Sequence, residues 1–175
     1  LGISECEFVA AFAGEGSVGI SADINALLPE LGTLGEVMAL TRNESSVHEK
    51  IGEYENVHTG KHAAMVLSDD IDLRIFPANW VHGFAVEKSG ETETRRSLQF
   101  FDAAGDAVHK IHLRPESDTR AYLALIERFR SDDQGPHVGP LRPRRAEADA
   151  YGQFNAGDDA RRGELRSRWE GMTDV

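Results

Sequence analysis

Between residues 95 and 113 the chain reads RRSLQFFDAAGDAVHKIHL. Two apolar-rich runs, Arg95–Phe101 and Ala107–Leu113, flank the turn-forming residues 102–106, which predicts two strands joined by a tight turn. A connection this short suits an antiparallel pair, because a parallel pair needs a crossover of about a dozen residues or more. The stretch therefore predicts an antiparallel hairpin.

The same pattern of short apolar segments separated by turn residues extends back to Glu36. The further predicted strands are Glu36–Thr41, Val47–Ile51, Tyr54–Val57, His62–Leu67, Asp70–Phe76 and Val81–Glu87. Most of the joints between them are short, so we expect antiparallel sheet across the whole region Glu36–Leu113.

Helices are predicted on both sides of this region. Ser4 and Glu7 form an S-x-x-E capping box, which predicts a helix that ends at the glycines after residue 13. A second helix is expected near Ala22–Leu28, broken by Pro29–Gly32. A third is expected over Asp118–Arg130, with one apolar stripe formed by Tyr122, Leu125, Ile126 and Phe129. The sequence therefore predicts an α+β fold, an antiparallel β-sheet flanked by helices.

Composition limits the partners that the chain can have. The formal net charge is −11, which argues against nucleic acid, since phosphate binding needs a basic face. The same charge means that any anionic ligand must be held by local arginines against the overall field. No apolar run reaches the roughly 18 residues of a membrane span. The single cysteine, Cys6, rules out an internal disulfide and fits a reducing compartment.

Three parts of the chain are distinguished by composition. Residues 1–130 contain the predicted helices and strands. Residues 131–163 are rich in proline, glycine and charge, and we expect a flexible linker with few contacts to the rest. Residues 164–175 resume a helical pattern, with Leu165, Trp169 and Met172 on one side. We expect this helix to lead into a second half that the sequence does not include.

The glycine-rich stretch Ala13–Gly19 loosely resembles a phosphate-binding loop. A phosphate loop follows a strand and opens a helix, whereas this stretch follows a predicted helix. We therefore interpret it as the C-terminal cap of that helix and a loop.

Two pairs of histidines have spacings that metal ligands can use, His58 with His62 and His109 with His112. Both pairs lie in sequence typical of strands or turns, where His109 and His112 would point to opposite faces. No cysteine or carboxylate cluster completes a metal-binding shell. We interpret them as surface or hydrogen-bonding histidines, and we predict no metal site from them.

The segment Ile71–Phe76 is the strongest candidate for a binding site. Strand alternation places Asp72, Arg74 and Phe76 on one face. An arginine beside a phenylalanine could hold a flat anionic ligand, by its guanidinium and by ring stacking respectively. The alternative is a surface ion pair between Asp72 and Arg74 beside a partly exposed ring.

Several stretches together match a known pattern. They are Gly35–Glu44, Val47–Glu49, Asp72–Phe76, Arg96–Asp102, Gly105–Lys110 and Trp169–Val175. In this order they resemble the HemS/HmuS/ChuS haemin-utilisation proteins, which are tandem repeats about twice this length. The resemblance implies that the chain is the N-terminal half of such a protein, with haem as cofactor.

The resemblance also implies roles for individual residues. Arg74 corresponds to an arginine on the distal side of the haem, with Phe76 beside it, and His48 to a histidine in a secondary haem contact. The principal axial histidine is expected immediately after Val175, and most propionate contacts are expected from the missing C-terminal half. No catalytic residue is implied within this chain.

Three functions remain open from sequence. The first is a cytoplasmic haem carrier for iron acquisition, which would receive haem from an importer or deliver it to a haem oxygenase. The second is a haem-degrading enzyme, which would need external electrons because no reductase or flavin motif is present. The third is a generic α+β interaction domain without haem. We favour the carrier.

Overall fold

The computed structural model describes residues 2–43, 45–90, 93–143, 163–164 and 167. Residues Leu1–Arg142 form one compact unit, and residues Pro143–Val175 form another. In the second unit Gly163, Glu164 and Ser167 are helical and exposed. The rest of the helix expected over residues 164–175 lies outside the described residues. None of the described helices is both long and apolar enough to cross a membrane.

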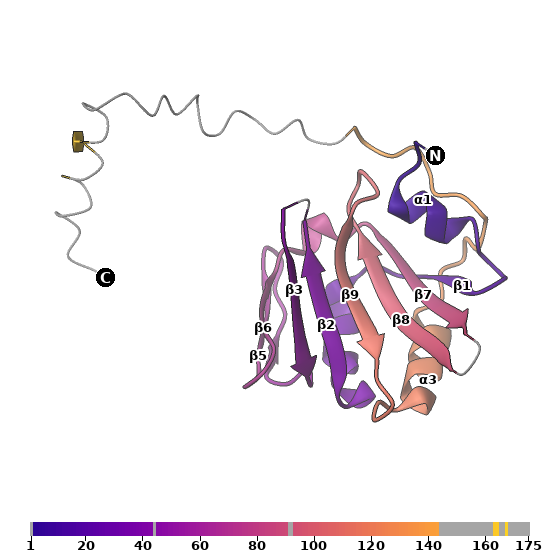
Figure 1. Ribbon diagram of the computed structural model, residues 1–175, viewed down its shortest axis with the longest axis horizontal. Helices are drawn as coiled ribbons and strands as arrows, with labels where there is room; N and C mark the ends of the chain where they lie inside the picture. The colour runs from indigo at the N-terminus through magenta and orange to yellow at the C-terminus, as the bar shows by residue number, and fades with distance from the viewer. Residues whose placement is uncertain (1, 44, 91–92, 144–162, 165–166, 168–175) are drawn as a thin grey trace. The chain divides into compact units, whose positions relative to one another are not determined.

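A six-stranded antiparallel sheet forms the centre of the first unit (Figure 1). In spatial order its strands are β1 (Ser17–Ile20), β7 (His82–Ser89), β8 (Thr94–Phe101), β9 (Ala107–Leu113), β2 (Val37–Arg42) and β3 (Val47–Gly52). The hairpin predicted over residues 95–113 is confirmed as β8 and β9. Its turn is held by the Asp102 carboxylate, which accepts hydrogen bonds from the amides of Ala104 and Asp106.

A separate three-stranded antiparallel sheet comprises β4 (Val57–His58), β5 (Ala64–Leu67) and β6 (Asp72–Ile75). The strands predicted over His62–Leu67 and Asp70–Phe76 are confirmed as β5 and β6. The strand predicted over Tyr54–Val57 is wrong except for Val57, because β4 begins there and Tyr54 is a buried residue outside any strand. A short 3-10 helix, η2 (Pro77–Asn79), then connects β6 to β7.

The first helix, α1 (Glu5–Ala10), begins with the predicted capping box. The Ser4 hydroxyl accepts a hydrogen bond from the Glu7 amide at 3.2 Å, and the Glu7 carboxylate accepts one from the Ser4 amide at 2.7 Å. These two bonds satisfy amide groups that a helix start leaves without partners. The hydrogen bonds from Ser4 lower the pKa of the Glu7 carboxyl.

The second helical segment is longer than predicted. After α2 (Ile24–Leu27), capped by Asp23, the chain continues as the 3-10 helix η1 (Leu28–Leu34). The α-helix thus ends before Pro29 as expected, but Pro29–Gly32 continues the chain as a 3-10 helix and does not end the helical segment. Pro29 lies in the first turn of η1, where a missing amide hydrogen costs no bond within the helix.

The third helix, α3 (Thr119–Phe129), matches its prediction closely. Asp118 caps it by accepting hydrogen bonds from the amides of Arg120 and Ala121. Of the predicted apolar stripe, Tyr122, Leu125 and Ile126 are buried, and Phe129 packs partly buried against the same core.

The glycine-rich stretch Ala13–Gly19 is more than the loop that we expected. Its last residues belong to β1, which pairs with β7 at the edge of the six-stranded sheet. Gly14 and Gly16 adopt positive φ angles of 84° and 143° and turn the chain back into the sheet. A side chain at Gly16 would lie 2.8 Å from the Glu87 carbonyl oxygen, so this approach requires glycine.

Two clusters of buried apolar side chains lie on opposite faces of the six-stranded sheet. Neighbouring residues of β7 show this, since Ala85 belongs to the larger cluster and Phe84 to the smaller one. The larger cluster includes side chains of α2, η1, α3 and the three-stranded sheet. In the smaller cluster, under α1, burial and nearby carboxylates raise the pKa of the Cys6 thiol to about 12.

The chain after α3 packs on the sheet as far as Arg142. The Gln134 side chain accepts a hydrogen bond from the Gly19 amide at 2.9 Å and donates one to the Gly19 carbonyl at 2.8 Å. It thereby occupies the free edge of β1 as a neighbouring strand would. The compact unit extends to Arg142, whereas we expected it to end at residue 130 and the linker to begin at residue 131. The flexibility predicted for residues 144–162 falls outside the described residues.

Candidate functional site

The candidate binding strand, β6, has the predicted alternation of side chains. Ile71, which precedes it, and Ile75 are buried in the core, whereas Asp72 and Arg74 are exposed. Phe76 follows the strand with 52% of its surface exposed, although phenylalanine is normally buried. A guanidinium and a phenyl ring therefore lie two residues apart on the outward side of the three-stranded sheet.

The Arg74 guanidinium is unpaired within the described part of the chain. It makes no ion pair and no side-chain hydrogen bond there, so the alternative of an Asp72–Arg74 pair is not formed. A free guanidinium can bind a carboxylate or another electron-rich group without first breaking a bond.

The neighbouring strand adds apolar surface to this face. In the register of β5 and β6, Met65 lies opposite Arg74 and Leu67 lies opposite Asp72. Directly opposite residues of an antiparallel pair project to the same face. Met65 is partly buried, and Leu67 is 42% exposed. Neither residue was predicted as part of the site. The sequence pattern predicts the strands on each side of the Ser68–Asp69 turn, but it does not predict which residues of the two strands pair.

His48 lies on a different sheet from Arg74. It is an exposed residue of β3, the edge strand of the six-stranded sheet. An ion pair links β3 to the segment before β6, but it does not involve His48. In this pair Lys50 of β3 lies 3.8 Å from Asp70. The structure therefore places Arg74 on β6 with Phe76 immediately after that strand, and it leaves His48 on a strand of the other sheet.

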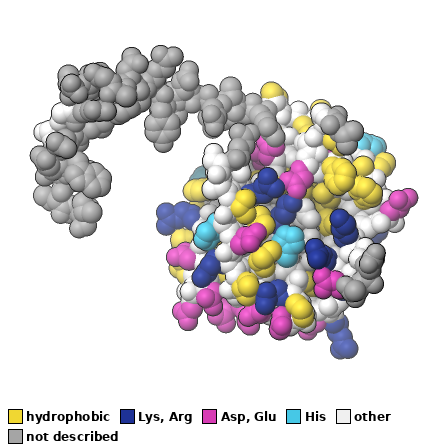
Figure 2. All heavy atoms as spheres, viewed as in Figure 1, with side chains coloured by type: hydrophobic (Ala, Val, Ile, Leu, Met, Phe, Trp, Pro, Cys, Tyr) yellow, Lys and Arg dark blue, Asp and Glu magenta, His cyan; other side chains and the backbone are white. Residues whose placement is uncertain are grey.

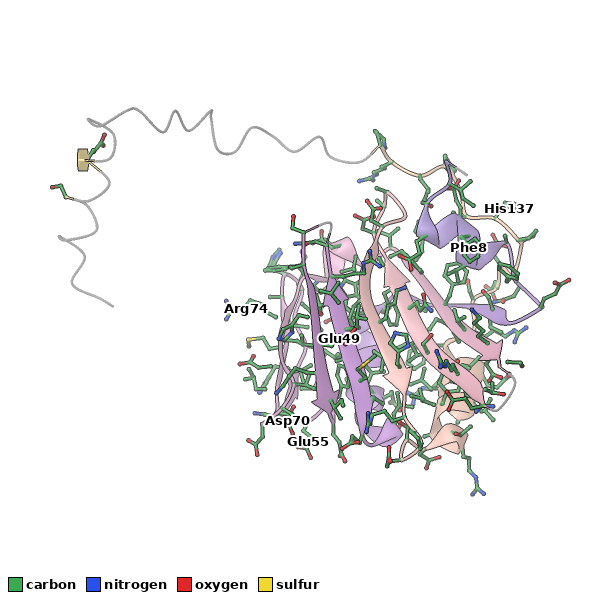
Figure 3. All side chains as sticks on the ribbon, in the orientation of Figure 1. Phe8, Glu49, Glu55, Asp70, Arg74 and His137 are labelled. Atoms are coloured by element: carbon green, nitrogen blue, oxygen red, sulfur yellow. The ribbon has the colours of Figure 1, made fainter. Side chains whose placement is uncertain are left out.

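Acidic side chains lie on the same side of the molecule as Arg74 (Figure 3). Figure 3 shows Asp70 on the same side of the molecule as Arg74, with Glu55 near Asp70. Figure 2 shows further acidic side chains gathered along the lower margin of the face that it presents. An anion bound beside Arg74 would depend on that guanidinium, in agreement with the expectation from net charge.

His109 is a buried hydrogen-bonding histidine, as predicted. Its Nδ1 lies 2.8 Å from the Thr41 hydroxyl and its Nε2 lies 2.6 Å from the Tyr54 hydroxyl. Trp80 packs beside the ring, with centroids 5.3 Å apart. Burial lowers the pKa of His109 to about 3, so the imidazole is neutral at pH 7. Both ring nitrogens are occupied, which leaves none for a metal.

The described residues do not form a metal centre of their own. They contain no group of three or more histidine, cysteine or carboxylate side chains able to hold an ion. A haem iron differs from such an ion, because the porphyrin supplies four nitrogens and the protein adds axial ligands. The chemistry of Arg74, Phe76 and Met65 suits one face of a flat ring that carries carboxylates.

A cavity of about 160 Å³ lies elsewhere, between β1, β7 and residues 131–139. His82 and His137 are among its lining residues, and Figure 3 places His137 on the opposite side of the molecule from Arg74. Cavities that enclose a ligand of drug size are larger, about 300 Å³ or more. Sequence analysis missed this cavity because it assigned one of its walls to a linker.

Comparison with known proteins decides the family. Residues 2–129 match the haemin-degrading HemS/ChuX domain. The chain belongs to the HemS/ChuX family. The whole chain is 36% identical to the hemin transport protein HmuS of Yersinia pestis, of which it covers 49%.

Two solved structures of relatives resemble this HemS/ChuX chain. Holo-PhuS, a heme-binding protein from Pseudomonas aeruginosa, is 40% identical with a TM-score of 0.82. ChuS, an E. coli heme oxygenase, is 31% identical with a TM-score of 0.75. Each comparison covers 99% of this chain and 49% of the other. The chain thus spans about half the length of these relatives, and the predicted α+β fold of one half of a tandem repeat is confirmed.

Proposed function

We propose that this chain is the N-terminal half of a cytoplasmic haem carrier and supplies one face of its haem site. The observation that carries the proposal is the Arg74 guanidinium, which has no partner among the described residues, beside the exposed Phe76 ring in a HemS/ChuX chain. Its relatives are named as hemin-transport and heme-binding proteins, which supports haem as the ligand.

Each residue has a distinct part in this proposal. Phe76 contacts the porphyrin by ring stacking, and Arg74 contributes charge or a hydrogen bond on the distal side. His48 provides a secondary contact, and the principal axial histidine follows Val175. Bound haem supplies the iron and its ligand chemistry, while the protein sets access and orientation. The carrier would receive haem from an importer and pass it to a degrading enzyme.

A haemin titration followed in the Soret band tests the proposal. Arg74→Ala should weaken binding by about tenfold or more, since a hydrogen bond to a charged group contributes about 1.5–3 kcal/mol. Arg120→Ala, which removes an exposed arginine from α3, is the matched control and should leave affinity unchanged. Absence of haemin binding, or equal effects of the two substitutions, would favour an interaction domain without haem.

The alternative function is haem degradation, favoured by the similarity to a structure named as a heme oxygenase. The two functions differ in what happens when an electron donor is added to the haem-loaded protein. A carrier keeps its Soret band when ascorbate is supplied in air. Progressive loss of that band, with formation of an open-chain tetrapyrrole retained by the protein, would support the enzyme instead.

A further inference from the structure

Tyr54, His109 and Trp80 form a buried group of aromatic side chains that the proposed function does not use. His109 lies on β9 and pairs across the sheet with Thr41 of β2, the neighbouring strand (Figure 1). Tyr54 precedes β4, and Trp80 follows η2, so separate parts of the chain meet at this imidazole. Tyr54 is 3% exposed and His109 is 2% exposed. The Tyr54 hydroxyl is therefore shielded from direct proton exchange with bulk water.

The hydrogen bond between Tyr54 and His109 has a definite direction. The Tyr54 hydroxyl lies 2.6 Å from Nε2, and the Thr41 hydroxyl lies 2.8 Å from Nδ1. A neutral imidazole has one N–H and one lone pair, so one of the two hydroxyls must donate to the ring. If Tyr54 accepted, its own buried O–H would lack an acceptor among the described residues, whereas Thr41 is partly exposed and can donate to water. Tyr54 therefore donates to Nε2, and Nδ1 donates to Thr41.

A phenol that donates to a base can lose an electron and a proton together. Loss of an electron makes the phenol strongly acidic, so its proton crosses to the base in the same step. Burial raises the pKa of the Tyr54 hydroxyl and lowers the pKa of His109 to about 3. Neither a phenolate nor an imidazolium therefore forms by itself at pH 7, and the proton stays on Tyr54 until an electron leaves.

Trp80 connects this pair to the surface. Its ring centroid lies 5.3 Å from that of His109, with 31° between the ring planes, and the Tyr54 centroid lies 6.3 Å from His109 on its own side. Trp80 is 7% exposed, the largest fraction of the three. An indole is readily oxidised by one electron, so an oxidant at the surface meets Trp80 first and reaches Tyr54 through it.

We propose that Tyr54 and His109 form a redox-active pair, which supplies an electron through Trp80 to a high-potential one-electron oxidant at the surface, such as a metal(III) complex or a peroxide-derived radical. The oxidant gains one electron from the Trp80 indole, and Tyr54 replaces that electron. The Tyr54 proton moves to Nε2 of His109, which leaves a neutral tyrosyl radical and an imidazolium. A one-electron reductant such as ascorbate reverses both transfers and restores the resting pair.

Tyr122 provides a comparison within the same chain. Its hydroxyl is also buried, but its neighbours among the described residues are the Val86 and Ser97 carbonyl oxygens, at 3.5 Å and 3.4 Å. A carbonyl oxygen accepts a hydrogen bond and does not take up the proton at pH 7. Tyr122 therefore has no base, and we expect it to stay reduced under conditions that oxidise Tyr54.

Photogenerated tris(bipyridine)ruthenium(III) is the oxidant for the test, with electron paramagnetic resonance and transient absorption as readouts. The parent chain carries Tyr151→Phe, so that Tyr54 and Tyr122 are its remaining tyrosines. It should form a neutral tyrosyl radical, more slowly in deuterium oxide than in water, because a proton moves with the electron. Tyr54→Phe should abolish that radical, and the matched control Tyr122→Phe should leave it unchanged. Each of these two substitutions removes one oxygen atom and keeps the ring.

Two more variants test the base and the path. His109→Gln can still accept a hydrogen bond but cannot take up a proton, so it should abolish the tyrosyl radical. Trp80→Phe keeps an aromatic ring that this oxidant does not oxidise, and it should lower the radical yield. Circular dichroism checks that both variants are folded.

Several results would overturn the proposal. They are the absence of a tyrosyl radical in the parent chain, a radical that survives Tyr54→Phe or His109→Gln, and equal loss in Tyr54→Phe and Tyr122→Phe. Formation at the same rate in water and deuterium oxide would also contradict it, because the proton would then not move with the electron. The experiment contains no haem, so its failure would leave the proposed function standing.

Discussion

At the scale of residues, period-two alternation predicted correctly that Arg74 and Phe76 share the outward side of β6. Alternation depends only on local backbone geometry, so a sequence pattern carries it. Met65 and Leu67 could not be found in the same way. Their place on the same face as Arg74 depends on strand register, and a shift of one residue would have turned them to the other face.

His109 should make the protein sensitive to acid. Its pKa in the folded protein is lowered to about 3, whereas an unfolded histidine titrates near 6.5. The unfolded state therefore binds the proton first, and stability is lost as pH falls from about 6.5 toward 3. The contribution of this residue is about 1.4 kcal/mol per pH unit in that window.

Chemical unfolding measured at several pH values, in the wild type and in His109→Gln, checks this prediction. The variant should be less stable at pH 7, because Gln cannot reproduce both the Thr41 and Tyr54 contacts. Its unfolding free energy should change less steeply between pH 6.5 and 4.5. Equal slopes for the two proteins would show that His109 titrates normally and is less protected than the structure indicates.

At the scale of elements, short turns and apolar alternation predicted the strands of both sheets. These local patterns do not show which strands belong to the same sheet, because the pairing of strands depends on packing across the whole unit. The edge strand β1 was missed for a related reason. β1 has only four residues, one of them glycine, so its alternation of apolar and polar side chains is too short to predict a strand. The strand is stabilised by hydrogen bonds with β7 on one edge and with the Gln134 side chain on the other.

Gln134 should protect the edge of β1. In Gln134→Ala the Gly19 amide loses its acceptor and becomes open to water, so its hydrogen exchange should accelerate. Amides in the β8–β9 hairpin should exchange as before. Asp132→Ala, at an exposed neighbouring position, provides the control. Unchanged exchange at Gly19 in Gln134→Ala would mean that residues 131–142 do not stay on the sheet.

At the scale of the whole molecule, the sequence resemblance identified the family and the half-length of the chain, both of which the comparisons confirm. Composition placed the end of the compact unit too early. Proline, glycine and charge are typical of linkers, but the specific contacts of Gln134 and Val138 hold this segment on the sheet. Such contacts join residues far apart in sequence and leave no local signature.

A chain that ends at residue 142 should therefore be as stable as the full chain. A chain that ends at residue 130 should lose about 2 kcal/mol or more, from the lost hydrogen bonds at Gly19 and the uncovered surface under Val138. Urea unfolding of the three proteins measures the difference. Equal stability of the two shortened chains would place the boundary at residue 130, as composition suggested.

The central claim is that this HemS/ChuX chain binds haem on the outward face of its three-stranded sheet. Haemin is paramagnetic, so it broadens the NMR signals of nearby amides. Substoichiometric haemin should broaden the amides of Met65, Arg74 and Phe76 first, and leave those of α1 and β1 sharp. Broadening centred instead on His82 and His137, beside the cavity, would contradict the claim and move the site to the opposite side of the molecule.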